Sequence, residues 1–219
     1  MKLFVWDFHG VLEKNNERAA QFITNKILKE AGYKERLTKK TGDELYGKRW
    51  FQYFEYLLPN ETHERHMELT YKCFDVGDFH PEIVEKYIRT APWAKMVLRK
   101  IAKKHDQILI SNTHRVALDR FLKSVELDKF FTADKIFSTD SHRNIPAKSK
   151  TEVAMDYVKN NPPVGGFDDI IVIGDAVEEM NLAKKLDAKF FLYAHKGKNF
   201  RECDCDNKIR DLRDIIRQI

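Results

Sequence analysis

Close to its beginning the chain reads Leu3-Phe4-Val5-Trp6-Asp7-Phe8-His9-Gly10-Val11-Leu12. The first four of these residues are apolar and lead directly into the carboxylate of Asp7. A short apolar run bounded by glycine is typical of a buried strand. Open α/β sheets place their chemistry just beyond the carboxyl ends of such strands. Asp7 is therefore a candidate nucleophile for phosphate transfer, a candidate metal ligand, or both.

Length and composition are those of a globular protein with one or two domains. The chain has 219 residues, of which 42% are hydrophobic and 33% are charged, so it is long enough to bury a sizeable core. Its 39 basic and 34 acidic residues give a net charge of +5 and are dispersed along the sequence. Nucleic-acid binders usually carry a clustered basic face. Nucleic acid is therefore not favoured as a partner, whereas a small acidic substrate would be attracted.

The sequence does not predict a membrane or secretory protein. Its apolar stretches are shorter than the ~20 residues that a membrane-spanning helix needs, and the opening Met1–Asp7 becomes charged too soon for a signal peptide. Three cysteines, an odd number, suit a reducing compartment better than a disulfide framework. We therefore expect a cytoplasmic protein.

Apolar residues recur at helical spacing in four successive segments near the start of the chain. These segments are 17–31, 50–58, 61–74 and the stretch that begins at Pro81. We therefore predict an inserted all-α domain over residues 14–90. The remaining residues, 1–13 and 91–219, are predicted to form the main domain.

Strand and helix patterns alternate in the rest of the chain. The predicted helices are 94–104, 116–125, 151–160 and 178–186, and the predicted strands are 108–110, 135–138, 170–173 and 189–193. Alternation of this kind indicates a parallel sheet with helices on both faces. The predicted fold class is thus α/β, with an all-α insertion after the first strand. A last, amphipathic helix is expected over 207–219.

Three of the apolar runs end in polar side chains that suit chemistry. The first ends at Asp7, the second in Ser111-Asn112 and the third in Gly174-Asp175. Each alone is unremarkable, since serine and aspartate commonly cap helices. A lysine, either Lys148 or Lys150, lies between the second and the third run. The order of these residues along the chain is the informative feature.

Together these segments resemble the four motifs of the haloacid dehalogenase superfamily. Asp7 to Leu12 is similar to the first motif, Ser111-Asn112 to the second, the lysine to the third, and Gly174-Asp175-x-x-x-Glu179 to the fourth. The resemblance covers the whole chain, including a helical cap of the C1 type inserted after the first motif, as in phosphoglycolate phosphatases and beta-phosphoglucomutases. It implies a Rossmann-like sheet and a phosphatase that uses Mg²⁺ and an aspartyl-phosphate intermediate.

The residue types fit these implied roles. Asp7 is ionised at neutral pH, because a free aspartate titrates at about 3.9, and it needs no base to attack phosphorus. Mg²⁺ would offset the repulsion between that carboxylate and the phosphate. We expect Asp7 and Asp175 to be direct ligands, and the resemblance adds the carbonyl oxygen of His9. Glu179 either binds the metal or its waters, or is an acid favoured by the helix dipole.

The second and third motifs are expected to hold the phosphoryl group. The Ser111 hydroxyl and the amides beside it, with Asn112, would bind a phosphoryl oxygen, and the lysine would neutralise the growing charge. Lys150 precedes the apolar Val153 by three residues, which fits the spacing in the family better than Lys148 does. Lys148 is the second candidate.

His9 departs from the usual first motif. In phosphatases of the superfamily this position holds an aspartate that donates a proton to the leaving oxygen and later activates water. Imidazole titrates at about 6.5 and can act as donor or acceptor, so we favour a working phosphatase in which His9 moves the proton. One alternative is a phosphotransferase or mutase with a longer-lived acyl phosphate. Another is a catalytically weak fold that binds nucleotides or nucleic-acid end phosphates.

The insertion is expected to select the substrate. Lys48 and Arg49 follow Gly47, at a turn that faces the site in caps of this type, and are candidate contacts to an anionic substrate. Helix charges that face solvent are the alternative interpretation. A helical cap suits a small phosphorylated substrate such as phosphoglycolate, a sugar phosphate or a nucleotide. The sequence is compatible with a monomer or a homodimer.

Overall fold

The chain divides into two compact units. The computed structural model describes residues 1–45, 48–140 and 148–219. One unit combines Met1–Lys14 with Arg89–Ile219, and the other consists of Asn15–Ile88. The first unit, called here the sheet unit, contains the parallel sheet, and the second, called the helical unit, is built from helices.

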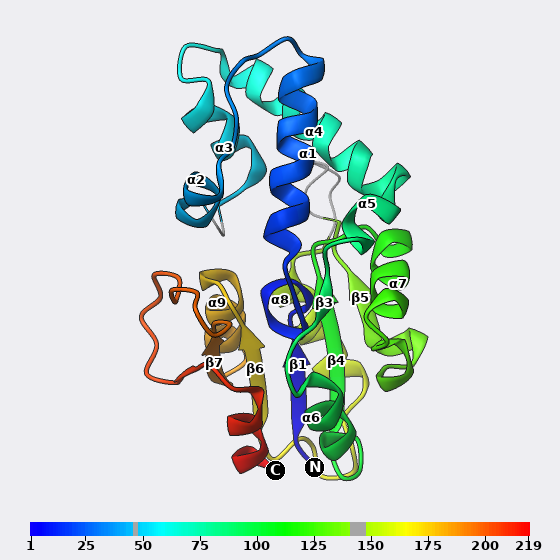
Figure 1. Cartoon of the computed structure of the whole chain (residues 1–219). Helices are drawn as coiled ribbons and strands as arrows, with labels where there is room; N and C mark the ends of the chain where they lie inside the picture. The colour runs from blue at the N-terminus through cyan, green and yellow to red at the C-terminus, as the bar shows by residue number, and fades with distance from the viewer. Residues whose placement is uncertain (46–47, 141–147) are drawn as a thin grey trace. The chain divides into compact units, whose positions relative to one another are not determined.

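The sheet unit is organised around a six-stranded parallel sheet (Figure 1). Its strands run in the order β5-β4-β1-β6-β7-β8. Their bounds are β1 Leu3–Trp6, β4 Asp106–Ser111, β5 Ile136–Ser138, β6 Ile170–Gly174, β7 Lys189–Tyr193 and β8 Lys208–Ile209. Every pair of neighbouring strands is parallel. The predicted α/β class, with a Rossmann-like parallel sheet, is confirmed.

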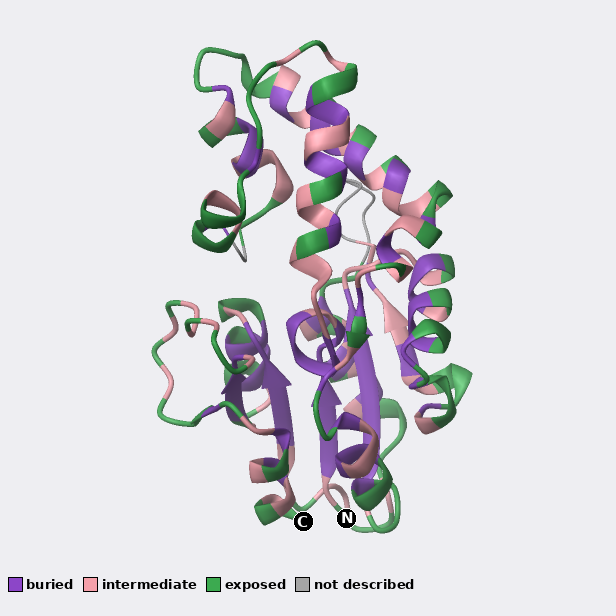
Figure 2. Ribbon diagram, in the orientation of Figure 1, coloured by how far each residue is buried: buried purple, intermediate pink, exposed green. Residues whose placement is uncertain are grey.

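The apolar run near the start of the chain forms the centre of this sheet. β1 pairs with β4 on one side and with β6 on the other, so that Leu3 lies opposite both Asp106 and Ile170. All four residues of β1 are buried (Figure 2). A strand with helices on both faces has no polar side, which explains why Leu3–Trp6 shows no alternation of apolar and polar residues.

Helices cover both faces of the sheet. The α-helices of this unit are α6 Ala94–Ile101, α7 Arg115–Ser124, α8 Lys150–Asn160 and α9 Val177–Lys185. Leu3 and Val5 pack with Ala154 of α8 and Ala183 of α9 in one core cluster. Figure 1 shows α6 in front of the sheet and α8 behind it. Short 3-10 helices at Asp128–Phe130 and Ala133–Lys135 lead into β5.

The end of the chain differs from the prediction. Residues 207–219 do not form one amphipathic α-helix, because Lys208–Ile209 is strand β8 and Leu212–Gln218 is a 3-10 helix. The Leu192 amide donates to the Asn207 carbonyl and the Ala194 amide donates to the Ile209 carbonyl, both at about 3 Å, so this segment completes the hydrogen bonding of β7. Leu212 and Ile215 are buried. Their spacing of three residues fits a 3-10 helix as well as it fits the α-helix that was expected.

The helical unit contains five α-helices among its described residues. They are α1 Asn16–Glu30, α2 Lys39–Glu44, α3 Trp50–Leu57, α4 His63–Phe79 and α5 Pro81–Glu85. Phe54 and Leu69 are buried without measurable exposure, so the aromatic segment that begins α3 supplies core. A two-stranded antiparallel ribbon, β2 Glu13–Lys14 with β3 Arg89–Thr90, carries the chain out of the sheet unit and back. Two-residue strands show no detectable periodicity, so the sequence did not predict the ribbon.

Within the described residues, no helix is both long and apolar enough to span a membrane.

Candidate active site

The turn after β1 places Asp7 at the carboxyl end of the sheet. The Asp7 amide donates to the Ile173 carbonyl of β6 at 3.0 Å, which extends the pairing of β1 and β6 by one residue. A short π-helical segment, Phe8–Leu12, follows and is interrupted at His9 and Gly10. Gly10 has a φ of 79°, in the left-handed region where a side chain would be strained. The glycine of the motif therefore lets the chain reverse directly after Asp7.

Three buried carboxylates meet at this edge. Asp7, Asp175 and Glu179 each offer an oxygen within 4.8 Å of the others, and the three residues are 8%, 5% and 3% exposed. Asp175 directly follows β6, and Glu179 lies in the first turn of α9. Gly174 makes this approach possible, because a Cβ at position 174 would collide with the Glu179 side chain. We call these three residues the carboxylate cluster.

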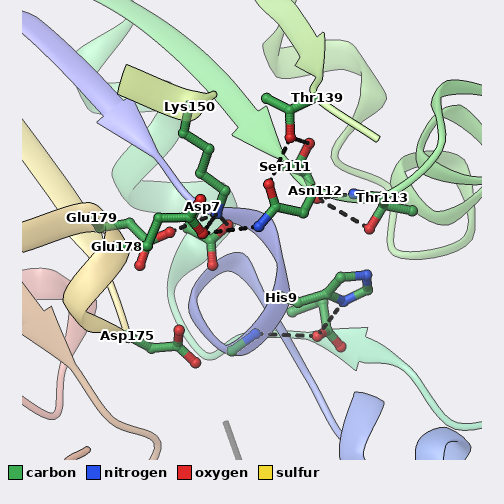
Figure 3. Close-up of polar contacts among 12 residues, drawn as sticks. Asp7, His9, Ser111, Asn112, Thr113, Thr139, Lys150, Asp175, Glu178 and Glu179 are labelled. Carbon is green, nitrogen blue, oxygen red and sulfur yellow. Dashed lines mark hydrogen bonds and ion pairs between the residues drawn. The ribbon is translucent and has the colours of Figure 1, made fainter. Parts of the chain in front are cut away.

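Lys150 binds one side of the carboxylate cluster. Its Nζ donates to Asp7 Oδ1 at 2.7 Å and to Glu179 Oε1 at 2.6 Å, and it lies 3.8 Å from Glu178 Oε2. Figure 3 shows Lys150, Glu178 and Glu179 directed toward Asp7. Burial lowers the pKa of the Lys150 ammonium, but the neighbouring carboxylates outweigh burial and raise its pKa above the ordinary value. Lys150 is therefore a permanent cation at Asp7.

The helix that carries Lys150 begins with a well-defined cap. Ser149 precedes α8, its side chain accepts a hydrogen bond from the Glu152 amide, and the Glu152 carboxylate accepts from the Ser149 amide at 2.7 Å. This reciprocal capping box fixes the first turn of the helix. Lys150 is the first helical residue, so the cap also fixes the start of its side chain.

Arg201 binds the other side of the carboxylate cluster. Its Nη1 donates to Asp175 Oδ1 at 3.0 Å, and its Nη2 lies 2.9 Å from Oδ2, which is the bidentate geometry that guanidinium favours with carboxylates. Arg201 belongs to the segment between β7 and β8. Sequence patterns did not predict this contact, because the segment has no periodicity that would indicate its path.

The two cations do not neutralise three carboxylates. Burial raises the pKa of the Asp175 carboxyl above its ordinary range, and Arg201 opposes that rise. Burial also raises the pKa of Glu179, against the opposing effect of Lys150. Glu179 Oε2 is buried and has no hydrogen-bond partner among the described residues. The site is thus suited to an additional positive charge.

A hard divalent cation fits this donor set. Mg²⁺ prefers oxygen ligands, chiefly one or two carboxylates with waters and substrate phosphate. Asp7, Asp175 and Glu179 supply carboxylate oxygens, and the unpartnered Glu179 Oε2 is one that a metal-bound water would satisfy. Among the residues that the structure describes, this is the one group of three or more potential ligands at such close range. The identity of the metal remains a prediction.

The second motif lies at the end of β4 and forms a polar network. Ser111 Oγ donates to Thr113 Oγ1 at 3.1 Å and accepts from the Thr113 amide at 3.2 Å. Asn112 Nδ2 donates to Glu178 Oε2 at 2.9 Å, and Thr139 Oγ1 donates to Asn112 Oδ1 at 2.6 Å. Asn112 is therefore linked through Glu178 to the Lys150 side of the cluster. Thr113, Thr139 and Glu178 were not predicted from the sequence.

His9 is held by a residue that the sequence interpretation did not single out. Its Nδ1 lies 2.9 Å from Glu13 Oε1, and its ring makes edge contacts with Phe8 and Phe121 at centroid distances of 4.9 and 6.0 Å. The His9 side chain is 25% exposed, whereas that of Glu13 is fully buried. The sequence alone did not indicate a role for Glu13, because a single acidic residue after the apolar pair Val11-Leu12 is expected to be exposed to solvent.

One of the two candidate lysines does not contact the carboxylate cluster. Lys148 is exposed and pairs with Asp156 Oδ2 at 2.5 Å, so Lys150 rather than Lys148 is the lysine at Asp7. Lys48 and Arg49 are exposed residues of the helical unit, and the Arg49 amide donates to Gln52 Oε1 at the start of α3. Gly47 lies outside the described residues.

Comparison with known proteins identifies the class. Residues 4–193 match a family described as haloacid dehalogenase-like hydrolase. The chain belongs to this family, and the predicted membership, with its hydrolase class, is confirmed. A comparison with curated proteins finds no match.

Solved structures with the same fold span nearly the whole chain. A predicted phosphoglycolate phosphatase from Haemophilus somnus is 15% identical, with a TM-score of 0.72 over 99% of this chain and 96% of its own. A candidate beta-phosphoglucomutase from Thermotoga maritima is 13% identical, with a TM-score of 0.66 and full coverage of both chains. A family hydrolase from Deinococcus radiodurans, solved with bound phosphate and sodium, is 14% identical, with a TM-score of 0.66 over 97% and 92%. At these identities the likeness concerns the fold.

Proposed function

We propose that the protein is a Mg²⁺-dependent phosphomonoesterase that acts through an aspartyl-phosphate at Asp7. The observation that supports this most strongly is the pairing of Asp7 with Lys150 inside a buried group of carboxylates. A carboxylate needs no base to act as a nucleophile. The lysine screens its charge and restricts its orientation.

The chain's own groups suffice to describe the proton and bond changes. An Asp7 carboxylate oxygen attacks phosphorus, the bond from phosphorus to the leaving oxygen breaks, and that oxygen takes the Nε2 proton of the protonated His9 ring, which becomes neutral. Water then attacks the phosphorus of the acyl phosphate and gives a proton to His9. The bond between Asp7 and phosphorus breaks, and inorganic phosphate leaves. Asp7 and His9 return to their starting states.

Other residues would hold the reacting group. Ser111 and Asn112, at the end of β4, are the proposed contacts to phosphoryl oxygens. Bound Mg²⁺, held by Asp7, Asp175, Glu179 and the carbonyl of His9, would offset the charge of the phosphoryl group and its nucleophile. We propose that the helical unit, predicted as 14–90, acts as a cap whose Lys48 and Arg49 contact a small phosphorylated metabolite in the cytoplasm.

A phosphotransferase or mutase is the second candidate function. One observation favours it. Position 9, where phosphatases of the family usually have an aspartate, holds a histidine, and the ring of this histidine is hydrogen-bonded to Glu13. If that pair activates water poorly, the acyl phosphate would persist long enough to pass to a second substrate. Phosphoryl transfer between sugar phosphates, with little release of inorganic phosphate, would distinguish this activity.

The test is phosphate release from an aryl phosphate and from a panel of phosphorylated metabolites. We expect turnover with Mg²⁺, loss of turnover with a chelator, and loss in Asp7→Asn. Asparagine keeps the size of Asp7 and can still accept from Lys150, so the variant tests the nucleophile rather than the fold. Undiminished turnover of Asp7→Asn would refute the nucleophile. No turnover or transfer with any metal or substrate would favour a binding protein.

A further inference from the structure

Glu13 is a buried acid whose side-chain hydrogen bonds, among the described residues, all go to the turn after Asp7. It is the first residue of β2 and is 0% exposed. Its Oε1 accepts from the Gly10 amide at 3.2 Å and lies 2.9 Å from His9 Nδ1. Its Oε2 has no hydrogen-bond partner within the described part of the chain.

Burying the Glu13 carboxylate with one unpartnered oxygen is expected to lower the stability of the fold, which argues against a purely structural role. A buried carboxylate is strongly unfavourable unless it is paired and hydrogen-bonded. Within the described ranges 1–45, 48–140 and 148–219, one basic side chain lies within ion-pair distance of Glu13, the ring of His9, which carries a positive charge only when it is protonated. The preceding residues Val11 and Leu12 are buried and apolar, so Glu13 is a buried acid that directly follows two apolar core residues.

The backbone around Glu13 is held firmly. Glu13 pairs with Thr90 in the β2–β3 ribbon. Its carbonyl oxygen lies 2.9 Å from His195 Nε2, and His195 Nδ1 lies 3.0 Å from the Tyr193 hydroxyl at the end of β7. The backbone that carries the Glu13 carboxylate is therefore held in place by the β2–β3 ribbon and, through His195, by the end of β7.

A carboxylate on Nδ1 determines what His9 presents to other molecules. An ionised carboxylate only accepts hydrogen bonds, so the ring nitrogen that faces it carries the hydrogen. Nε2 is then the nitrogen available to a substrate or to water. Phe8 and Phe121 border the ring and offer no competing hydrogen bond.

We propose that Glu13 is a positioning residue, which holds the His9 ring by Nδ1 so that Nε2 is the nitrogen that serves the leaving oxygen and the attacking water. Glu13 acts through His9 and does not contact the substrate. The proposal rests on the proposed function for its catalytic consequence. The orientation and tautomer of the ring can be measured without any activity.

The first test is a ¹⁵N spectrum of the histidine side chains, recorded at mildly alkaline pH. The His9 signal is assigned by its loss in His9→Asn. In the wild-type protein we expect hydrogen on Nδ1, and in Glu13→Leu we expect the neutral ring to shift toward the Nε2–H form. Hydrogen on Nε2 alone in the wild-type protein would overturn the proposal, even if Glu13→Leu does not fold. An unchanged tautomer in a folded Glu13→Leu would do the same.

The second test is a double-mutant cycle on turnover of an aryl phosphate with Mg²⁺. Glu13→Leu is expected to lower kcat by about 10- to 100-fold, which is less than the ~10²- to 10⁴-fold typical of general acid–base catalysis because the His9 ring is still present, with KM changed less than about twofold. Glu13→Gln, whose amide oxygen can accept from His9 and Gly10, should recover most of that loss. Glu35→Leu, at an exposed position of the helical unit, is the matched control for charge.

The His9→Asn background separates positioning from general damage. There, Glu13→Leu should cause little further loss, because the group that it positions is already absent. An equal loss in both backgrounds would show that Glu13 acts through the Gly10 turn and would overturn the inference. A wild-type protein without turnover would refute the proposed function instead, and the spectrum would still decide the role of Glu13.

Discussion

The two sides of the carboxylate cluster are bound by cations of different kinds. Lys150 lies in the first turn of a capped helix, its side chain is 5% exposed, and it contacts Asp7 and Glu179. Arg201 lies in the segment between β7 and β8, its side chain is 23% exposed, and it contacts Asp175. The cation beside the proposed nucleophile therefore lies on a capped helix. The cation beside Asp175 lies on a loop, so that less of the structure has to move to displace it.

The largest expected effect comes from removing the cation on the capped helix. Lys150→Met should lower kcat by at least about 100-fold, as is typical when a preorganised electrostatic contact is lost. It should also lower the free energy of unfolding by about 3 kcal/mol in the absence of metal, because buried carboxylates lose a partner. Steady-state kinetics and denaturant unfolding measure the two effects. Lys150→Arg is the control that keeps the charge, and wild-type kcat in Lys150→Met would remove Lys150 from the mechanism.

A smaller effect is expected from removing the cation on the loop. Arg201→Gln should bind Mg²⁺ more tightly, by about fivefold, because the ion no longer competes with a guanidinium for Asp175. A contact worth about 1 kcal/mol corresponds to that ratio. Titration calorimetry with Mg²⁺ alone, with Arg201→Lys for comparison, measures the affinity. Weaker binding in Arg201→Gln would mean that Arg201 helps to organise the metal site instead.

Metal binding should stabilise the wild-type protein. Ligands that bind the folded state raise the apparent stability by mass action, and the carboxylate cluster has three carboxyl groups for two cationic side chains. Mg²⁺ at a hundred times its Kd should add about 2.7 kcal/mol to the free energy of unfolding. Thermal unfolding with and without Mg²⁺ measures this, and Asp175→Asn should reduce the increment. An identical shift in both proteins would place the ion elsewhere.

The smallest effect is expected at the lysine two residues from Lys150. Lys148 is exposed and pairs with Asp156, and exposed ion pairs contribute about 0–1 kcal/mol. Lys148→Met should therefore leave kcat within about twofold of wild type and change stability little. The same assays apply. A loss of kcat comparable to that of Lys150→Met would contradict the difference in roles between the two lysines.

The sequence predicted the parts of the site that depend on regular structure. Asp7, Ser111 and Asp175 each follow an apolar run, and the ends of parallel strands meet at one edge of a sheet. Lys150 was preferred because of its spacing from the next helix, and it is the lysine that contacts Asp7. Its catalytic role stays a prediction, as do the catalytic, substrate-binding and metal-binding roles of all the other predicted site residues.

Contacts that depend on tertiary structure could not be predicted from local sequence patterns. Arg201 reaches Asp175 from an irregular segment, and the burial of Glu13 arises from the β2–β3 ribbon, whose strands are two residues long. The helix expected over 207–219 was wrong because pairing with β7 takes precedence over apolar spacing. Local patterns fix neither a long-range ion pair nor the last strand of a sheet.

The most direct measurement is detection of the proposed covalent intermediate. The wild-type protein is mixed with substrate and Mg²⁺ and quenched in acid within a single turnover, and its peptides are analysed by mass spectrometry. We predict one phosphoryl group on the peptide that contains Asp7, and none in Asp7→Asn. Turnover without a phosphorylated peptide, or a phosphoryl group on another residue, would contradict the mechanism.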